Sequence, residues 1–491
     1  MRQSSFKSTS SRILMAALLA LSLAPVGMSA PVQAAPAAAQ AASAQGTWKG
    51  ELKVPGRGLG MEFTFSQAAD GAWSGTLFVV GQTPQPLPFS RVTVDGSRLV
   101  AEASNIHATF EATLSADGKV LEGRWKQGMA NLDLSMARQA SASAPVAAAR
   151  RPQDPVAPFP YAEEEVRYVN PRGNITLAGT LTLPRRPGPH PAVVLITGSG
   201  AQNRDSELMG HRPFKVIADD LTRRGIAVLR VDDRGVGGSS GSVTDATSAD
   251  FSHDVKAGLN FLKSRKDIDP KRIGLVGHSE GALIAPMAAA GNPDVAFMVL
   301  LAGQGMSGDA IIELQTDVIN RKLGKTEAQL EAIRKLQREA LAICAGPMSR
   351  EEAAPKLRAL LETQLPKDNP EAAEAMRAQF DMQVDAMLSR WYRYFLTADS
   401  VPYLRRVTCP VLALNGENDV QVPYRENLQG ISKALSEAGN RDVTTKSLPK
   451  LNHLFQTSQT GMVDEYETID ETFAPVALKT MGEWLERKAL R

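Results

Sequence analysis

The sequence predicts an α/β protein with a doubly wound, mostly parallel sheet and a helical cap insertion, preceded by a small all-β domain. Three patterns lead to this fold class: apolar runs that alternate with helical segments, one long helical stretch that interrupts them, and short alternating runs near the N-terminus. Continuous apolar runs are typical of strands buried on both faces of a parallel sheet. Strands that alternate with helices along the chain form a sheet with helices on both sides.

Residues 1–34 predict a signal peptide. Basic residues precede the apolar run 13–21, and small residues favour cleavage after Ala34, with Ala30 as the alternative. A membrane anchor is the competing interpretation, but the run is too short to span a bilayer comfortably, and no later stretch reaches about eighteen apolar residues. We therefore expect an exported protein, periplasmic or secreted, with no stable membrane insertion.

Residues 46–138 predict the small all-β domain, a sandwich or a barrel of about eight strands. Asp70-Gly71, Asp95-Gly96 and Asp117-Gly118 separate its alternating runs as hairpin turns would. We expect a structural or docking role for this domain, and a barrel that holds a ligand is the alternative. Residues 139–162 are rich in Ala and Pro without periodicity, which is typical of a linker.

Residues 163–491 predict the α/β domain, which a hairpin of residues 165–170 and 176–183 opens. The stretch from about 305 to 390 is too long for a loop, and it contains a capping box at 326–329 ahead of a helical apolar stripe. We expect it to form a cap over the site, because insertions at the carboxyl ends of such strands overhang bound ligands. A subdomain remote from the site is the alternative. The predicted buried strands are Ala192–Ile196, Ile226–Val231, Ile273–Val276, Val295–Leu301 and Val411–Leu414.

Gly277-His278-Ser279-Glu280-Gly281 is the strongest chemical motif. It follows a predicted buried strand and precedes a helix-like segment, which is the context of a nucleophile elbow. Such an elbow holds a serine on a sharp turn, where side chains two residues to either side would clash. We therefore predict that Ser279 is a nucleophile.

A serine hydroxyl needs a base and the base needs an orienting acid, in the chain order serine, acid, histidine. His453 is the histidine that fits this order late in the chain. Asp419 follows the last predicted strand and is the expected acid, with Glu417 as the alternative. The acid accepts a hydrogen bond from the histidine and stabilises its protonated form.

An oxyanion that develops during attack needs preorganised backbone donors. One should be the N–H of Glu280, directly after the nucleophile. The other should come from the glycine-lined turn Thr197-Gly198-Ser199-Gly200, where we choose the N–H of Ser199 and keep Gly200 as the alternative.

Charge and composition restrict the class of partner. The formal charge of +2 becomes about −1 without the three basic residues of the predicted signal peptide, so neither nucleic acid nor an anionic membrane is indicated. Cys344 and Cys409 are too few for a disulfide framework and have no metal-ligand spacing. We expect two semi-buried thiols, and a bridge between them in an oxidising compartment is the alternative. The segment 232–239 lacks the lysine of a phosphate-binding loop, so we interpret it as scaffold in which Arg234 could pair with a neighbouring aspartate.

Five motifs together resemble one family. The chain is similar over about residues 160–490 to bacterial α/β-hydrolases of the serine-aminopeptidase-like group, including carboxylesterases with a small β domain ahead of the catalytic one. The resemblance implies a carboxylic-ester hydrolase that uses Ser279, Asp419 and His453 and needs neither cofactor nor metal. The motifs are Thr197-Gly198-Ser199-Gly200, Asp233-Arg234-Gly235-Val236-Gly237, Gly277-His278-Ser279-Glu280-Gly281, Gly416-Glu417-Asn418-Asp419 and Asn452-His453-Leu454-Phe455.

From these residues we predict a serine esterase that forms an acyl-enzyme on Ser279 and acts on a small-molecule ester. A peptidase or aminopeptidase would use the same triad and is the first alternative. A binding protein with a residual hydrolase domain is the second. The sequence indicates no particular oligomeric state.

Overall fold

The computed structural model divides the chain into two compact units. One contains the N-terminal β domain and residues 368–376, and the other contains residues 150–367 and 377–491. The predicted signal peptide, 1–34, and residues 140–150 of the predicted linker lie outside the described residues. The described residues are 43–54, 57–67, 73–79, 87–103, 108–127, 130–139, 151–244, 246–377 and 379–490.

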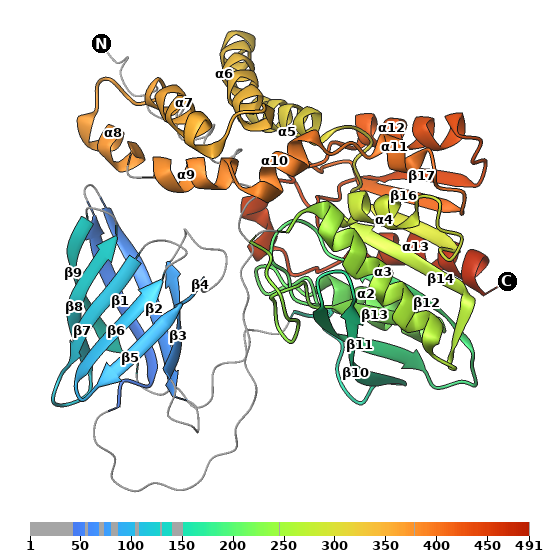
Figure 1. Cartoon of the computed structure of the whole chain (residues 1–491), viewed down its shortest axis with the longest axis horizontal. Helices are drawn as coiled ribbons and strands as arrows, with labels where there is room; N and C mark the ends of the chain where they lie inside the picture. Colours follow the sequence, from blue (N-terminus) through green and yellow to red (C-terminus); the bar gives the residue numbers. More distant parts are fainter. Residues whose placement is uncertain are drawn as a thin grey trace, which may run out of the picture. The chain divides into compact units, whose positions relative to one another are not determined.

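The β domain contains, in its described part, a nine-stranded antiparallel sheet in the order β4-β3-β2-β1-β9-β8-β7-β6-β5 (Figure 1). Turns at Asp95-Gly96 and Asp117-Gly118 join neighbouring strands as predicted, whereas Asp70-Gly71 lies outside the described residues. The strands are β1 Gly46–Val54, β2 Arg57–Gln67, β3 Trp73–Val79, β4 Leu87–Pro88, β5 Arg91–Asp95, β6 Arg98–Ala103, β7 Ala108–Leu114, β8 Val120–Gln127 and β9 Ala130–Arg138.

Two consecutive residues between β4 and β5 close this sheet into a barrel. The N–H of Phe89 donates to Gly75 in β3, at 2.9 Å, and the N–H of Ser90 donates to Glu102 in β6, at 2.7 Å. The chain thus bridges the two edges of the sheet, which are formed by β4 and β5. Apolar side chains, with Trp48 and Phe63 fully buried among them, pack together in the described interior.

The second unit contains an eight-stranded sheet in the order β10-β11-β13-β12-β14-β15-β16-β17. β11 is antiparallel to both of its neighbours, β10 and β13. The six strands β13, β12, β14, β15, β16 and β17 are parallel to one another. This confirms the predicted fold class, including the hairpin that opens the domain. The strands are β10 Tyr161–Asn170, β11 Ile175–Pro184, β12 His190–Ile196, β13 Ala227–Val231, β14 Ile268–His278, β15 Phe297–Leu301, β16 Val411–Gly416 and β17 Val443–Leu448.

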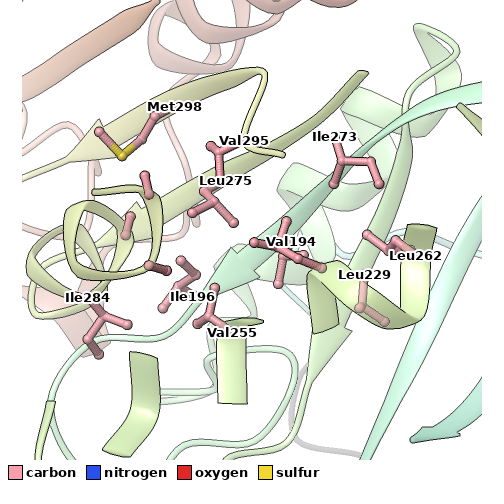
Figure 2. Close-up of a cluster of buried hydrophobic side chains, with 14 of the residues drawn as sticks. Val194, Ile196, Leu229, Val255, Leu262, Ile273, Leu275, Ile284, Val295 and Met298 are labelled. Carbon is pink, nitrogen blue, oxygen red and sulfur yellow. The ribbon is translucent and has the colours of Figure 1, made fainter. Parts of the chain in front are cut away.

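Helices cover both faces of this sheet. On one face, α3 (Ser248–Ser264), α4 (Gly281–Ala289) and α12 (Tyr424–Glu437) pack on apolar strand residues, and Figure 2 shows Val255 and Ile284 of α3 and α4 close to Ile196 of β12. On the other face, α2 (Pro213–Arg223) and α13 (Pro475–Ala489) form a second apolar cluster. Because the sheet is buried on both faces, its strands are continuously apolar.

A run of helices between β15 and β16 forms the predicted cap insertion (Figure 1). The capping box at Thr326 is present and begins α6, as predicted. None of the described helices is both long and apolar enough to cross a membrane. The helices of this insertion are α5 Gly308–Lys322, α6 Glu327–Ala345, α7 Arg350–Glu362, α8 Pro370–Arg377, α9 Phe380–Met387, α10 Arg390–Thr397 and α11 Val401–Leu404.

Candidate active site

A sharp turn between β14 and α4 presents Ser279. Its φ of +56° lies in the left-handed region that non-glycine residues seldom adopt. A Cβ on Gly277 would lie 2.1 Å from the carbonyl oxygen of Gly281, and a Cβ on Gly281 would lie 2.2 Å from that of Ile196. Only glycine fits at both positions, which is the steric reason that the motif was expected to carry them.

Ser279, His453 and Asp419 form a hydrogen-bonded chain. The Ser279 Oγ lies 3.0 Å from Nε2 of His453, and Nδ1 of His453 lies 2.8 Å from Oδ2 of Asp419. Because a carboxylate only accepts, Nδ1 carries the proton and Nε2 is free to accept from the serine. The aspartate and the histidine are 3% and 4% exposed, so water competes little for these bonds.

The sheet brings the three residues together, because β14, β15, β16 and β17 are parallel neighbours whose carboxyl ends share one edge. Asp419 follows β16, and its Oδ1 accepts from the backbone N–H groups of Gln421, at 2.8 Å, and Val422, at 2.9 Å. His453 lies in the loop after β17, between Lys450 and Phe455, which have φ values of +64° and +61°.

The competing residues have other partners. Glu417, the alternative acid, is exposed and accepts from the hydroxyl of Ser447 at 2.8 Å. Nε2 of His278 donates to the carbonyl oxygen of His453 at 2.8 Å, so it supports the histidine loop and does not bind the serine. Burial and the neighbouring His453 lower the pKa of His278 to about 3, which keeps it neutral.

The two backbone N–H groups that the sequence suggests as oxyanion donors belong to Ser199 and Glu280. Among the described residues, the N–H groups of Ser199 and Glu280 have no acceptor. The loop that carries Ser199 passes directly against the nucleophile, since a Cβ on Gly198 would lie 3.2 Å from Cβ of Ser279. The side chain of Gln202 donates to the carbonyl oxygen of Ser199 at 3.0 Å and helps to hold this loop.

Asp233 fastens both ends of the same loop. It accepts from the hydroxyl of Thr197 at 2.7 Å and from the N–H of Gln202 at 2.9 Å. Burial raises the pKa of Asp233 to about 8, against the lowering effect of these two bonds. The segment interpreted as scaffold therefore supports the loop that presents a predicted oxyanion donor.

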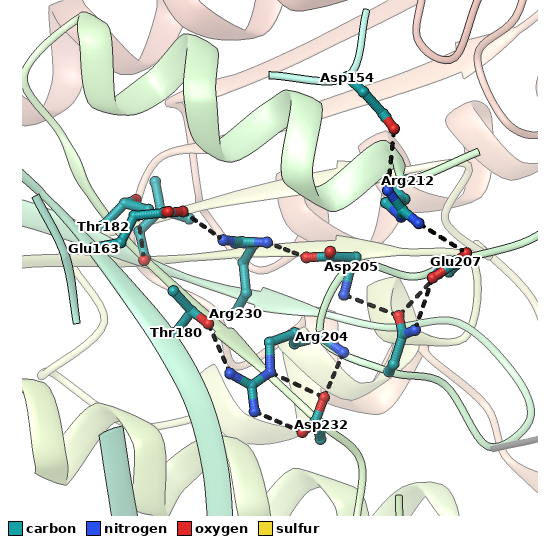
Figure 3. A network of polar contacts seen from close by, with 12 residues as sticks. Asp154, Glu163, Thr180, Thr182, Arg204, Asp205, Glu207, Arg212, Arg230 and Asp232 are labelled. Atoms are coloured by element: carbon teal, nitrogen blue, oxygen red, sulfur yellow. Dashed lines mark hydrogen bonds and ion pairs between the residues drawn. The ribbon is translucent and has the colours of Figure 1, made fainter. Parts of the chain in front are cut away.

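The neighbouring charges differ from the expected pairing. Arg234 binds Asp254, with Nε 2.8 Å from Oδ2, and the expectation that it pairs with Asp232 or Asp233 was wrong. Asp232 binds Arg204 instead, at 2.8 Å between Nη2 and Oδ2, whereas Asp233 accepts from the Ser199 loop. Figure 3 shows this pair within a wider ionic network that fixes the segment following the Ser199 loop.

A cavity of about 40 Å³ lies beside the Ser199 loop. Gly198 and Gly200 line it together with Asp233, Phe251 and Val255, and Ser279 is not among its lining residues. It has room for a few water molecules rather than a substrate. We therefore place the reaction at the hydrogen-bonded triad and not in this cavity.

The side chain of Glu280 has a role that sequence reasoning missed. It is 2% exposed and accepts from the hydroxyl of Ser248 at 2.6 Å and from Nε1 of Trp391 at 2.9 Å. Trp391 belongs to α10 of the cap, so this carboxylate joins the elbow to the cap. Burial raises the pKa of Glu280, although these hydrogen bonds oppose the rise.

Cys344 and Cys409 are free thiols. Within the ranges that the structure describes, no His, Cys, Asp and Glu side chains gather in a group of three or more that could hold a metal ion.

The sequence of this domain matches a known family. Residues 211–458, which include Ser279, Asp419 and His453, match serine aminopeptidase, S33. The chain belongs to this family. It is therefore a hydrolase with an α/β-hydrolase domain.

Individual relatives extend this likeness. Esterase EstD of Thermotoga maritima is 26% identical over 281 residues, which are 57% of this chain and 58% of EstD. The thiohydrolase apmlB of Arthrinium phaeospermum is 36% identical over 126 residues, 26% of this chain and 38% of the relative. The chain thus spans less than two thirds of the length of either relative.

Among solved structures, the Pyrococcus furiosus esterase Pf2001 is 17% identical with a TM-score of 0.41, covering 67% of this chain and 92% of Pf2001. The α/β-hydrolase GrgF from Penicillium is 18% identical with a TM-score of 0.42, covering 67% of this chain and all of GrgF, 100%.

Proposed function

We propose that the protein hydrolyses carboxylic esters through an acyl-enzyme formed on Ser279. The observation that carries this proposal is the chain of hydrogen bonds from Ser279 through His453 to the buried Asp419, with donor–acceptor distances of 3.0 and 2.8 Å. A serine whose hydroxyl donates to a histidine can lose its proton as it attacks a carbonyl carbon.

In the first half of the reaction, Nε2 of His453 takes the hydroxyl proton while Oγ of Ser279 bonds to the carbonyl carbon of the ester. The carbonyl oxygen becomes an oxyanion and accepts from the N–H groups of Ser199 and Glu280. The carbon–oxygen bond to the alcohol then breaks, and His453 gives its proton to the leaving alcohol. Donors of this kind are typically worth about 3 kcal/mol each in the transition state.

In the second half, His453 takes a proton from water while the water oxygen attacks the acyl carbon. The bond to Oγ of Ser279 breaks, the proton returns to Oγ, and the carboxylic acid leaves. Asp419 accepts from Nδ1 throughout and stabilises the positive charge that His453 carries in each transition state. The acid's own backbone donors, Gln421 and Val422, keep it in place.

A peptidase is the second candidate, because the family that the chain belongs to is described as serine aminopeptidase. An aminopeptidase must bind a free α-amine, normally with a carboxylate near the serine. Glu280 already accepts from Ser248 and Trp391. Four further acids in the cap, Glu339, Glu351, Glu352 and Glu362, are exposed. The ester reading is favoured for this reason, and by the relative that is named an esterase.

The test compares p-nitrophenyl acetate and butyrate with the p-nitroanilides of alanine and proline at equal enzyme concentration. We expect higher kcat/KM for the esters, since an amine is a worse leaving group than a phenol and depends more on protonation by His453. A higher value for either anilide would favour the peptidase. Absence of both activities together with no reaction with a fluorophosphonate probe would favour a binding protein.

Ser279→Ala is the decisive variant in this comparison, and Ser436→Ala, an exposed serine in α12, is its control. Ser279→Ala should abolish probe labelling and ester turnover in a protein that still folds. Ser436→Ala should change neither. Labelling that persists at another serine in the Ser279 variant would disprove the assignment of the nucleophile.

A further inference from the structure

The cap contacts the nucleophile elbow through Trp391. Its Nε1 lies 2.9 Å from Oε1 and 3.1 Å from Oε2 of Glu280, whose backbone N–H is a proposed oxyanion donor. Glu280 directly follows Ser279, so the indole binds the residue next to the nucleophile although Trp391 is 111 residues further along the chain than Glu280. The tryptophan itself is only half-buried.

The indole is held in one orientation. Its ring stacks on Phe395 of the same helix, with centroids 5.5 Å apart and an interplanar angle of 20°. The helix that carries both rings packs closely against the start of α5. At Gly308, which begins α5, the two backbones approach so closely that a Cβ would lie 1.9 Å from the carbonyl oxygen of Phe395. A ring fixed at its N–H and on one face can act as a wall with its remaining exposed surface.

The reaction geometry decides which part of the substrate meets this wall. The tetrahedral carbon carries four groups: Oγ of Ser279, the oxyanion, the alcohol and the acyl chain. The alcohol must lie near Nε2 of His453, which protonates it. The ring of His453 neighbours His278, with centroids 4.9 Å apart, and makes no hydrogen bond to the Glu280–Trp391 pair among the described residues. On this ground we assign the acyl chain, rather than the alcohol, to the side of the serine where Trp391 lies.

We propose that Trp391 is the specificity-determining residue of this site, and that its indole, fixed by Glu280, restricts the acyl group of the ester to short chains. This inference rests on the proposed ester hydrolysis. Glu280 thus has two functions: its backbone N–H donates to the oxyanion, and its carboxylate fixes the position of the Trp391 indole. Substrates with acetyl to butyryl groups fit, whereas an octanoyl chain meets the ring.

Two substitutions separate the ring from its hydrogen bond. The amide nitrogen of glutamine is as many bonds from Cβ as Nε1 of tryptophan is, so Trp391→Gln keeps a donor for Glu280 and removes the ring. Trp391→Phe keeps a ring and removes the donor. Thr397→Ala, at the exposed end of the same helix, is the control for effects on α10. Fluorophosphonate titration counts the competent sites in each variant.

The measurement is kcat/KM for p-nitrophenyl acetate, butyrate and octanoate, expressed as the octanoate-to-acetate ratio. Trp391→Gln should raise this ratio by about tenfold or more, because a pocket wall discriminates by roughly that factor for small changes in chain length. Trp391→Phe should raise it by less than about threefold, and Thr397→Ala should leave it unchanged. If Trp391→Gln yields no titratable sites, Trp391→Leu must give the same shift in its place.

A ratio in the ring-free variant equal to that of the wild type would overturn the proposal. A parallel series of butyrate esters with lengthening alcohols tests the assignment to the acyl side, and a shift confined to that series would also overturn it. If the wild type hydrolyses esters without any shift in these variants, only the role of Trp391 fails. If the wild type hydrolyses no ester, the proposed function fails and this inference fails with it.

Discussion

In the β domain, each buried side chain that the structure describes is apolar or aromatic, as in the cluster around Phe63 and Trp48. The α/β domain also buries charged and polar groups, and Asp419, Glu280 and His453 are among them. Every described non-glycine residue with a positive φ, Ser279 included, belongs to the α/β domain. The described part of the β domain therefore has little buried polarity and no strained non-glycine backbone, whereas the α/β domain has both, including at Ser279 and the residues around it.

This difference indicates where the chain does chemistry. Burying a polar group costs free energy unless hydrogen bonds compensate it, and a strained backbone costs about 1–3 kcal/mol per residue. Such costs are found where function requires them. The β domain shows none of these features in its described part, which is consistent with a structural role.

The largest effect is expected on kcat, from replacing the buried acid Asp419 of the α/β domain. Asp419→Asn should lower kcat by about 10⁴, because an amide in place of the carboxylate no longer selects the tautomer that leaves Nε2 free. Glu417→Gln is the matched control and should change kcat little, since Glu417 is exposed and binds Ser447. Initial rates on p-nitrophenyl butyrate measure both. A greater loss in the Glu417 variant would mean that the acid is assigned wrongly.

A smaller effect, confined to one domain, is expected from Phe63→Ala. The ring of Phe63 is fully buried and lies 5.1 Å from that of Phe110, so its removal leaves a cavity that should cost about 3–5 kcal/mol in the free energy of unfolding of the β domain. Fluorophosphonate labelling of Ser279 should persist at the wild-type rate under native conditions. Denaturant titration measures the change in the free energy of unfolding. Ser66→Ala, at an exposed neighbouring residue, is the control.

Loss of labelling in a Phe63 variant whose α/β domain remains folded would break the comparison, because it would show that the β domain shapes the active site.

The smallest effect is expected at Asp233, whose contribution to the free energy of unfolding should depend on pH. Burial raises its pKa to about 8, so the folded protein keeps this proton between about pH 4 and 8, where the unfolded chain releases it. The contribution of the group to stability is therefore complete at low pH and is lost as the pH rises through this window. Asparagine has no proton to lose, so Asp233→Asn should be relatively more stable at pH 9 than at pH 5, compared with the wild type.

Urea denaturation of both proteins at pH 5, 7 and 9 measures this difference. Parallel stability curves across the range would contradict a raised pKa for Asp233.

Periodicity predicted the architecture of the α/β domain because its strands are buried on both faces and its helices on one. β17, Val443–Leu448, was not predicted: it lies at the edge of the sheet and is largely exposed, so its sequence carries no apolar run. The described part of the β domain has nine strands where about eight were expected, because the closing segment is divided into β4 and β5 around Phe89.

At the site, chain order and local motifs were enough to select Ser279, Asp419 and His453, which the structure brings within hydrogen-bonding distance. The partner of Glu280 could not be found this way. Trp391 is far away in sequence, and no local pattern distinguishes an indole that meets a carboxylate from one that packs a helix. The partner of Arg234 was missed for a related reason, since two adjacent aspartates were nearer in sequence than Asp254.

The close backbone contacts at Gly277 and Gly281 have a consequence for engineering. At both positions any side chain meets a carbonyl oxygen at little more than 2 Å, so a saturation library there would return only the parent residue. Trp391, held by its N–H on the Glu280 carboxylate and by one stacked ring, is open to replacement. Laboratory evolution of substrate range in this protein would therefore accumulate its changes in the cap, while the elbow beneath it stays invariant.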